Sequence, residues 1–161
     1  MLSFNRRTLL VLPLALAACG FTPVYGPGGT ASALRGRVEV AAPGSVDSYH
    51  LVQNLEERLG RSSAPDYSLD LTLQSGAQGQ AITASNEITR YSLVGKVDYT
   101  LRAKSSGQIV ASGSVDNFTG YSATGSTVET LAAERDARAR LMVILADQIT
   151  TRLYATADLT Q

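Results

Sequence analysis

The sequence predicts a two-layer α+β domain, in which a mixed four-stranded sheet carries two amphipathic helices on one of its faces. Two segments with about one apolar residue per helical turn predict the helices, and four segments in which apolar and polar residues alternate predict the strands. The elements follow one another in the order β-α-β-β-β-α along residues 34–161. The first two strands are joined through a helix and can be parallel if adjacent, whereas the later hairpins are antiparallel.

The first two elements are a short strand and a helix. Alternation of apolar and charged residues predicts a half-buried strand over 34–40. Asp47 or Ser48 can cap the helix that follows, and Gly60 is expected to end it. The helix is amphipathic, and its apolar stripe consists of Leu51, Val52, Leu55 and Leu59.

Three further strands are predicted in the middle of the chain. One covers 67–74, and the small, polar segment 75–87 after it is either a frayed strand or the tip of a hairpin. The clearest alternation spans 91–102, and a turn then leads back into an antiparallel partner over 109–115. Alternation directs one set of side chains of the 91–102 strand away from the helices, namely Ser92, Lys96, Asp98, Thr100 and Arg102.

Glycines interrupt two of these strands. Gly95 lies in the third strand and Gly113 in the fourth. A glycine weakens a strand slightly, and it permits either a bulge or the close approach of another part of the chain.

The last helix is predicted to begin after Ser126, because Ser126 and Glu129 match a capping box. Its apolar face consists of residues one turn apart, at Leu141, Leu145, Ile149 and Leu153. The opposite face is charged and solvated, and Asp136 and Arg140 on that face form an i,i+4 pair.

Residues 1–18 have the layout of a bacterial secretory signal peptide that is cleaved on export. Arg6 and Arg7 precede an apolar run over 8–18, which is shorter than the roughly twenty residues of a membrane-spanning helix. The two arginines leave twin-arginine export open, but the residues around them fit that pattern poorly. General secretion is therefore favoured.

Cys19, the single cysteine, closes the stretch LAAC, which resembles the lipobox of bacterial lipoproteins. In that resemblance cleavage falls before Cys19, its sulfur receives a diacylglycerol, and the new amino group receives an acyl chain such as palmitate. The alternative is a buried cysteine that happens to follow a leader. The residue after Cys19 is Gly20 and not an aspartate, and by the same resemblance this indicates that the protein is sent to the outer membrane. Residues 19–33, rich in glycine and proline, are interpreted as a lipidated tether.

Composition limits the possible partners and the means of stabilisation. The chain carries 14 basic and 14 acidic residues, and loss of the leader removes two basic ones, so the mature chain is slightly acidic. That balance gives no basic surface for nucleic acid. Without a second cysteine there is no internal disulfide, so the fold depends on packing.

No set of residues expected for catalysis or metal binding is visible in the sequence. His50 is the sole histidine, and its position near a helix start favours a surface or capping role. The segment 120–125, GYSATG, is one residue too long for a nucleophile elbow, and no histidine follows it. We therefore expect no enzymatic activity, no metal and no cofactor apart from the lipid on Cys19. A binding or assembly role is favoured.

Over nearly all of its length the chain resembles the LptE family of lipopolysaccharide-assembly lipoproteins in its alphaproteobacterial form. The resemblance lies in the order and spacing of ACGFTPVYG, LVQNLEERLG, YSLDLTL, RYSLVGKVDYTLR and TLAAERDARARLMVILADQITTRL. It implies a domain anchored in the inner leaflet of the cell outer membrane, on its periplasmic side, and lodged as a plug in the lumen of the barrel protein LptD. It also implies that the complex inserts lipopolysaccharide into the outer leaflet.

The resemblance supplies no ligand residue. The family's contacts with lipopolysaccharide are attributed to basic residues, whereas 75–88 and 119–134 contain neither lysine nor arginine here. The nearest basic candidates for contact with anionic groups of the glycolipid, or with the barrel, are Arg90, Lys96, Arg102 and Lys104. Ordinary surface charge is the alternative for each. The polar face of the 91–102 strand would suit a polar barrel lumen, and exposure to periplasmic water is its alternative.

Two other functions remain open on the sequence alone. An outer-membrane lipoprotein that assists a phospholipid-transport complex could share the leader and the α+β layout. A small periplasmic hydrolase on a lipid tether is the second, but no residue can be nominated for its catalysis.

Overall fold

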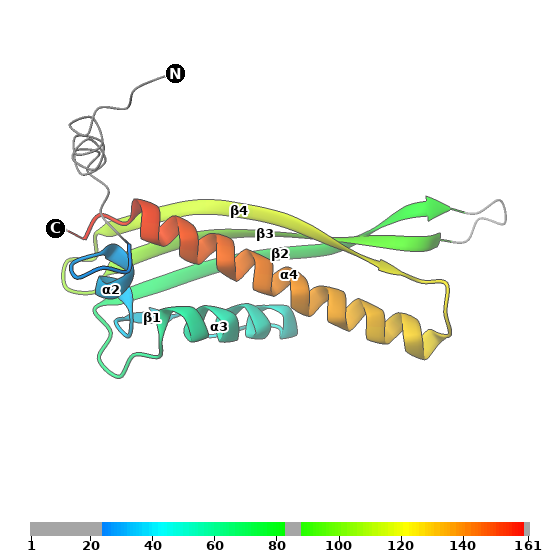
Figure 1. The fold of residues 1–161 in the computed structure, drawn as a ribbon, viewed down its shortest axis with the longest axis horizontal. Helices are drawn as coiled ribbons and strands as arrows, with labels where there is room; N and C mark the ends of the chain where they lie inside the picture. The colour runs from blue at the N-terminus through cyan, green and yellow to red at the C-terminus, as the bar shows by residue number, and fades with distance from the viewer. Residues whose placement is uncertain (1–23, 83–87, 160–161) are drawn as a thin grey trace, which may run out of the picture.

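The computed structural model describes residues 24–82 and 88–159, and it has the predicted α+β class (Figure 1). Helices α3 and α4 cover one face of a four-stranded sheet, and a third, short helix precedes the first strand. In chain order the elements are α2 (Thr30–Leu34), β1 (Val38–Val40), α3 (Val46–Leu59), β2 (Tyr67–Ile82), β3 (Ile88–Ala103), β4 (Ile109–Ser122) and α4 (Thr127–Thr156).

The sheet is mixed, as predicted. Its strands lie in the order β1-β2-β3-β4, with β1 parallel to β2 and the other neighbours antiparallel. β1 pairs with β2 from Val38 opposite Tyr67 to Val40 opposite Leu69. The β2–β3 and β3–β4 pairs are far longer, so the sheet extends from a compact end at β1 into a long two-hairpin arm (Figure 1).

The core lies between the sheet and the two long helices. Odd-numbered residues of β3 point into it, because Leu93, Val97 and Leu101 are each at most 1 % exposed. The helices contribute the predicted stripes, and the fully buried members are Leu51, Leu55, Leu59, Leu145, Ile149 and Leu153. Burial of one such side chain contributes about 1.5–3 kcal/mol, so this interface is the main source of stability.

The two strand glycines permit close approach. A Cβ on Gly95 would lie 2.9 Å from Leu145 Cδ1 of α4, and a Cβ on Gly113 would lie 2.7 Å from the Tyr99 hydroxyl. The β3–β4 register is continuous past both residues and shifts between Leu101 and Arg102. Of the two alternatives, close packing therefore explains these glycines.

The first strand is shorter than predicted, and the segment before it is helical. Leu34 ends α2 and is fully buried, and Ala31 is 2 % exposed, so the packed domain begins before residue 34. Gly36 has φ 70° and donates its amide to the Leu59 carbonyl at 2.7 Å. This left-handed turn, which glycine adopts readily, separates α2 from β1. A strand over the whole of 34–40 was the wrong interpretation.

The start of α3 also differs from the prediction. Its cap is Ser45, whose hydroxyl accepts the Ser48 amide at 3.1 Å, while the Ser48 hydroxyl accepts the Ser45 amide at 2.8 Å. Asp47 is the second residue of the helix, within its first turn, and does not cap it. The predicted end at Gly60 is confirmed, with φ 77°.

Both hairpins are longer than predicted, and the predicted start of the last helix is confirmed. The segment after residue 74 continues β2 to Ile82, and β4 continues past Val115 to Ser122. The Ser126–Glu129 capping box of α4 is present, with the Ser126 amide donating to Glu129 Oε2 at 2.7 Å.

The molecule has two distinct ends (Figure 1). The first described residues and the last turn of α4 lie at one end, where the Tyr25 and Tyr154 rings meet edge to face at 5.7 Å. The β2–β3 hairpin reaches the opposite end. We call these the terminal end and the hairpin end.

Candidate interaction surface

The helices leave one face of the sheet open. We call it the outer face, and it consists of the even-numbered residues of 68–78, 90–102 and 112–122. Gly95 faces α4, so its neighbours in β3 point the other way. This confirms the predicted outward set of Ser92, Lys96, Asp98, Thr100 and Arg102, each at least partly exposed, whereas Leu93, Val97, Tyr99 and Leu101 are buried.

The outer face is polar, and two of its cations are paired with carboxylates. Lys96 Nζ lies 3.7 Å from Asp98 Oδ1 on the same strand, and Arg102 Nε lies 3.7 Å from Asp70 Oδ2 across the β2–β3 ladder. The remaining members are mostly hydroxyl and amide residues, among them Ser68, Thr72, Gln74, Gln78, Thr100 and Ser112. Such a face suits contact with water, sugars or other polar protein surfaces.

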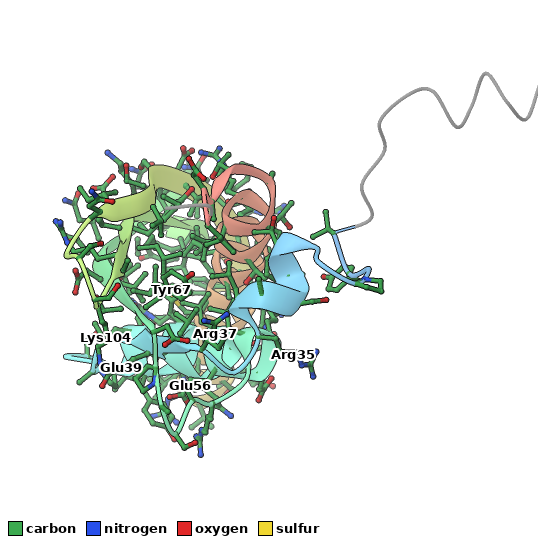
Figure 2. The ribbon with its side chains drawn as sticks, turned by 90° about the vertical axis from the view of Figure 1, so that its left-hand side faces the viewer. Arg35, Arg37, Glu39, Glu56, Tyr67 and Lys104 are labelled. Carbon is green, nitrogen blue, oxygen red and sulfur yellow. The ribbon has the colours of Figure 1, made fainter. Side chains whose placement is uncertain are left out.

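The four candidate basic residues share this side of the molecule but do not converge. Arg90 and Arg102 are twelve positions apart on one strand, which is roughly 40 Å. Lys104 follows β3 and pairs with Glu39 of β1 at the terminal end, as Figure 2 shows. The candidates therefore form a line along the molecule, and they do not form one anion-binding cluster.

Arg90 differs from the other three candidates. Within residues 24–82 and 88–159, no carboxylate lies within ion-pair distance of its guanidinium. Its Nε would lie 3.8 Å from a Cβ on Gly120, so the side chain crosses toward β4 next to a residue without a side chain. It is exposed and lies in the arm of the sheet toward the hairpin end.

Sequence reasoning missed an aromatic residue on the outer face. Phe118 is 67 % exposed and lies opposite Val94 in the β3–β4 ladder. Gly76 is the next residue in the same row, opposite Val94 on the other side. Continued alternation past Val115 would have placed Phe118 outward, but the strand was predicted to end there.

The helix-facing side of the arm carries a tyrosine pair. Tyr91 and Tyr121 are cross-strand partners whose rings stack at 5.3 Å and 12°. Burial raises the pKa of Tyr121, and the nearby Glu134 carboxylate raises it further. The phenol therefore stays neutral at physiological pH, and the pair closes the core where α4 begins.

The terminal end carries further paired charges (Figure 2). Arg37 pairs with Asp66 and lies 5.9 Å from the centre of the Tyr67 ring. The hydrogen bond to Asp66 is the main reason that the pKa of Arg37 is raised. These contacts join the start of β1 to the start of β2, and we assign them to the fold.

The described residues do not assemble a catalytic or metal site. His50 lies on α3 with its ring 5.9 Å from that of Tyr49. Ser122 of the elbow-like segment lies at the end of β4, with its hydroxyl 3.1 Å from that of Thr124. Over 24–82 and 88–159 no group of three His, Cys, Asp or Glu residues could hold a metal ion. No helix in the same ranges is long and apolar enough to cross a membrane. Cys19 and the leader lie outside the described residues.

An elongated α+β domain with an open, polar sheet face defines a class of binding or assembly proteins, since its distinctive feature is a surface. The chain belongs to the LptE lipopolysaccharide-assembly family, which matches residues 36–153. Membership gives it a broad role in lipopolysaccharide assembly and places it among lipoproteins associated with the outer membrane.

Three solved structures with the same fold are described as lipoproteins. A protein of Caulobacter crescentus CB15 described as a putative lipoprotein matches with a TM-score of 0.66 and 22 % identity, over 81 % of this chain and 96 % of that one. The rare lipoprotein B of Shewanella oneidensis matches with a TM-score of 0.58 and 11 % identity, over 74 % and 93 %. Lipoprotein B of Nitrosomonas europaea gives 0.56 and 15 %, over 75 % and 83 %. A comparison with curated proteins found no match.

Proposed function

We propose that this protein is a non-catalytic subunit of the lipopolysaccharide translocon, held at the periplasmic face of the outer membrane by lipid on Cys19. In this role it lies inside the LptD barrel, supports assembly of that barrel and assists insertion of lipopolysaccharide into the outer leaflet. The observation that carries the proposal is the polar, charge-balanced outer face on a member of the LptE family.

The dimensions of the domain suit a plug. β2 and β3 each have 16 residues, or roughly 50 Å of strand, and α4 has 30 residues, or about 45 Å of helix. The hydrocarbon layer of a bilayer is about 30 Å thick. A domain of this length inside a barrel would span the membrane and still reach beyond it.

The chemistry of the outer face suits the same location. The lumen of a large outer-membrane barrel is polar, so a plug needs a surface that is polar without a strong net charge. The outer face offers hydroxyl and amide groups, and its Lys96 and Arg102 are already neutralised by carboxylates. At these two cations the face can contact a polar wall without the cost of burying an unpaired charge.

The terminal end also fits an anchored plug. Lipid on Cys19 would hold the domain near the point where Val24 enters it, at the terminal end (Figure 1). The hairpin end would then project away from the anchor, along the lumen. Among the candidate glycolipid contacts, Arg90 lies in this arm and has an unpaired guanidinium in the described part of the chain. It is the best placed to bind a phosphate or carboxylate group.

Affinity purification from detergent-solubilised outer membrane tests the assignment. With a tag after Gln161, we expect a large barrel protein to co-purify, and depletion of the protein should lower surface lipopolysaccharide and mature barrel. Recovery of lipid-transport components with no barrel would instead favour a role in phospholipid transport. Unchanged surface lipopolysaccharide after depletion would contradict the proposal.

The Arg90 contact has a separate test. Arg90→Ala should lower the amount of lipopolysaccharide that co-precipitates with the purified protein. Lys104→Ala is the matched control, because Lys104 is already paired with Glu39. Equal retention by both variants would remove Arg90 as a ligand residue and leave the translocon assignment untouched.

A further inference from the structure

One long edge of the sheet lacks a neighbour. β1 pairs with β2 as far as Leu69, and the last bond on this side runs from the Ala41 amide to the Leu69 carbonyl at 2.9 Å. The chain then runs through the loop 41–45, which lies beside Leu71–Leu73, and enters α3, whose Asp47 accepts the Ser75 hydroxyl at 2.8 Å, while β2 continues to Ile82. Over 70–82, β2 therefore has β3 on one side and no strand on the other among the described residues.

The backbone groups on this free edge can be identified. The Tyr67 amide donates to the Arg37 carbonyl, and the Leu69 carbonyl accepts the Ala41 amide, so odd-numbered residues of β2 direct both groups toward the β1 side. The same direction holds for Leu71, Leu73, Ser75, Ala77 and Gly79. Within the described chain these five residues make no backbone hydrogen bond outside the β2–β3 ladder.

The opposite edge of the sheet, along β4, is covered. The Asp158 amide donates to the Val110 carbonyl at 3.0 Å, and Arg152 Nη1 donates to the Ser114 carbonyl at 2.5 Å. The Phe118 amide donates to the side chain of Asn117 at 2.8 Å. Side chains and the chain end thus occupy groups that an incoming strand would need. Among the described residues no such hydrogen bond reaches the backbone of β2 over 71–79. The loop 41–45 lies beside Leu71–Leu73 without bonding to their backbone groups.

The sequence of the free edge also lacks the usual protection. Edge strands are commonly blocked by lysine, proline or a bulge. Residues 71–82, LTLQSGAQGQAI, contain no charged residue and no proline. The β2–β3 register is regular until the shift between Gly79 and Ala81. Leu71–Gly79 is therefore a straight, uncharged stretch that can accept another strand.

A pocket lies directly beside this edge. It has a volume of about 360 Å³ and lies between the loop 41–45, α3 and residues 71–73 of β2. Its apolar lining comes from Leu51, Val52, Leu71 and Leu73. A strand added in line with β1 would direct alternate side chains toward the helices, and hence into this pocket.

We propose that an extended segment of a partner protein adds to the sheet along Leu71–Gly79 and places a large apolar side chain in this pocket. The segment is uncharged and has large apolar residues at alternate positions. Backbone hydrogen bonds provide the affinity and the pocket provides the selectivity, as in other cases of strand addition. This inference goes beyond the translocon assignment, since it depends on the β2 edge alone.

A second copy of this chain fits the edge less well. If two β2 strands paired about Ser75, Gly79 of one copy would lie opposite Leu71 of the other, and Ala77 would lie opposite Leu73. Glycine and alanine are too small to fill the pocket. In this register, the lining therefore favours a segment of a different protein.

Photocrosslinking in intact cells tests the proposal with the full-length protein. A photoreactive amino acid is placed at Gln74 or at Gln78, which are exposed and lie on the same strand. We expect both positions to link to one segment of one partner, at residues four positions apart, because added strands keep register. Links to a second copy, to lipid alone, or to scattered sites would overturn the proposal.

Variants at Ala77 provide the second measurement. Ala77→Pro removes an amide from the free edge but none from the β2–β3 ladder, so it should lower crosslinking at Gln74 at least fivefold. Ala77→Val keeps the amide and should leave the yield within twofold. If the proline variant does not fold in a thermal melt, Ala77→Lys replaces it, since a charge there blocks strand addition. Unchanged crosslinking in a folded Pro or Lys variant would contradict the proposal.

Discussion

Gly95 is the residue at which α4 comes closest to β3. A Cβ there would lie 2.9 Å from Leu145 Cδ1 and 3.1 Å from Leu141 Cδ2, and both leucines are buried and closely packed. Leu141 and Leu145 can therefore pack this closely only because residue 95 has no side chain. Gly76 on the neighbouring strand is different, since nothing lies within 4 Å of a Cβ built on it.

Gly95→Val should consequently lower the free energy of unfolding by about 1–3 kcal/mol through overpacking. Gly76→Val is the matched control and should be neutral or slightly stabilising, because valine favours an extended backbone. Denaturant unfolding of both variants measures the difference. Equal effects would show that the Gly95 contact tolerates a larger side chain.

Arg138 joins three elements through one carboxylate. Its Nη1 lies 3.0 Å from Asp47 Oδ2, and the same oxygen accepts the Ser75 hydroxyl at 2.8 Å. Its Nη2 lies 2.8 Å from Glu134, and this hydrogen bond is the main reason that the pKa of Arg138 is raised. The Asp47 side chain is 13 % exposed, so it depends on these partners.

Arg138→Ala should destabilise the protein by about 1–3 kcal/mol, because it leaves the largely buried Asp47 carboxylate without its cation. Arg140→Ala removes an exposed i,i+4 pair with Asp136 and should cost about 0.5 kcal/mol or less. Thermal unfolding of the two single variants compares them. A loss for Arg138→Ala no larger than that for Arg140→Ala would contradict the assigned role.

At the level of helices, the start of α4 gives a pH-dependent prediction. The amide and hydroxyl of Ser126 hydrogen-bond to Glu129 and lower the pKa of its carboxyl below the ordinary 4.5. Because the pKa of Glu129 is lower in the folded protein than in the unfolded chain, this cap stabilises the fold fully above the unfolded pKa. The stabilisation is lost as the pH falls through the folded pKa. The difference in thermal unfolding midpoint between wild type and Glu129→Ala should therefore shrink once the pH falls below about 4.5. Thermal melts across pH 3–7 measure it, and a difference that grows in acid would exclude this cap.

The elements that sequence predicted best are those with strong periodicity and a recognisable cap. α4 begins at Ser126 as predicted, because a capping box is a local hydrogen-bond pattern that tertiary contacts did not override. The cap of α3 was misplaced because Ser45, Asp47 and Ser48 are all suitable cap residues within one turn. The contact of Asp47 with Arg138, far along the chain, decided between them.

The remaining errors arose where long-range pairing replaces a local signal. Leu34 fitted the alternation of a strand, but a helix of five residues has too few turns to show a period. β4 continues to Ser122 because β3 is long enough to pair with it, although few of its residues beyond Val115 are buried. Thr119 faces the helices there and donates its hydroxyl to the Ala137 carbonyl at 3.0 Å. A polar residue with a polar partner gives no hydrophobic pattern to detect.

For the molecule as a whole, alternation predicted the direction of the outer-face side chains but could not predict their grouping. That Lys96 and Arg102 lie on the same face of the sheet follows from strand geometry alone. Their pairing with Asp98 and Asp70 depends on the β2–β3 register and on rotamers, which the sequence does not specify. The free edge of β2 was not predictable, because it follows from the short length of β1.

The anchor itself is tested on the intact protein. Cys19→Ser should abolish incorporation of labelled palmitate and shift the protein out of the outer-membrane fraction. The fold should be unchanged, because the packed domain contains residues from Ala31 onward. Circular dichroism and a thermal melt provide the control. A variant that still takes up lipid and stays in the membrane would contradict the lipobox interpretation.

Tyr25 and Tyr154 meet at the terminal end, so the first described residues and the end of α4 mark the same end of the long axis. The orientation of that axis relative to a membrane can therefore be measured. A fluorophore on Thr156, in the last turn of α4, would report the terminal end, whereas one on Gln78 of β2 would report the arm. Energy transfer from each to an acceptor dye in the bilayer would give two heights. The difference between the two heights, compared with the distance between the labelled residues, gives the tilt of the long axis. It distinguishes a domain standing upright from one lying flat on the membrane.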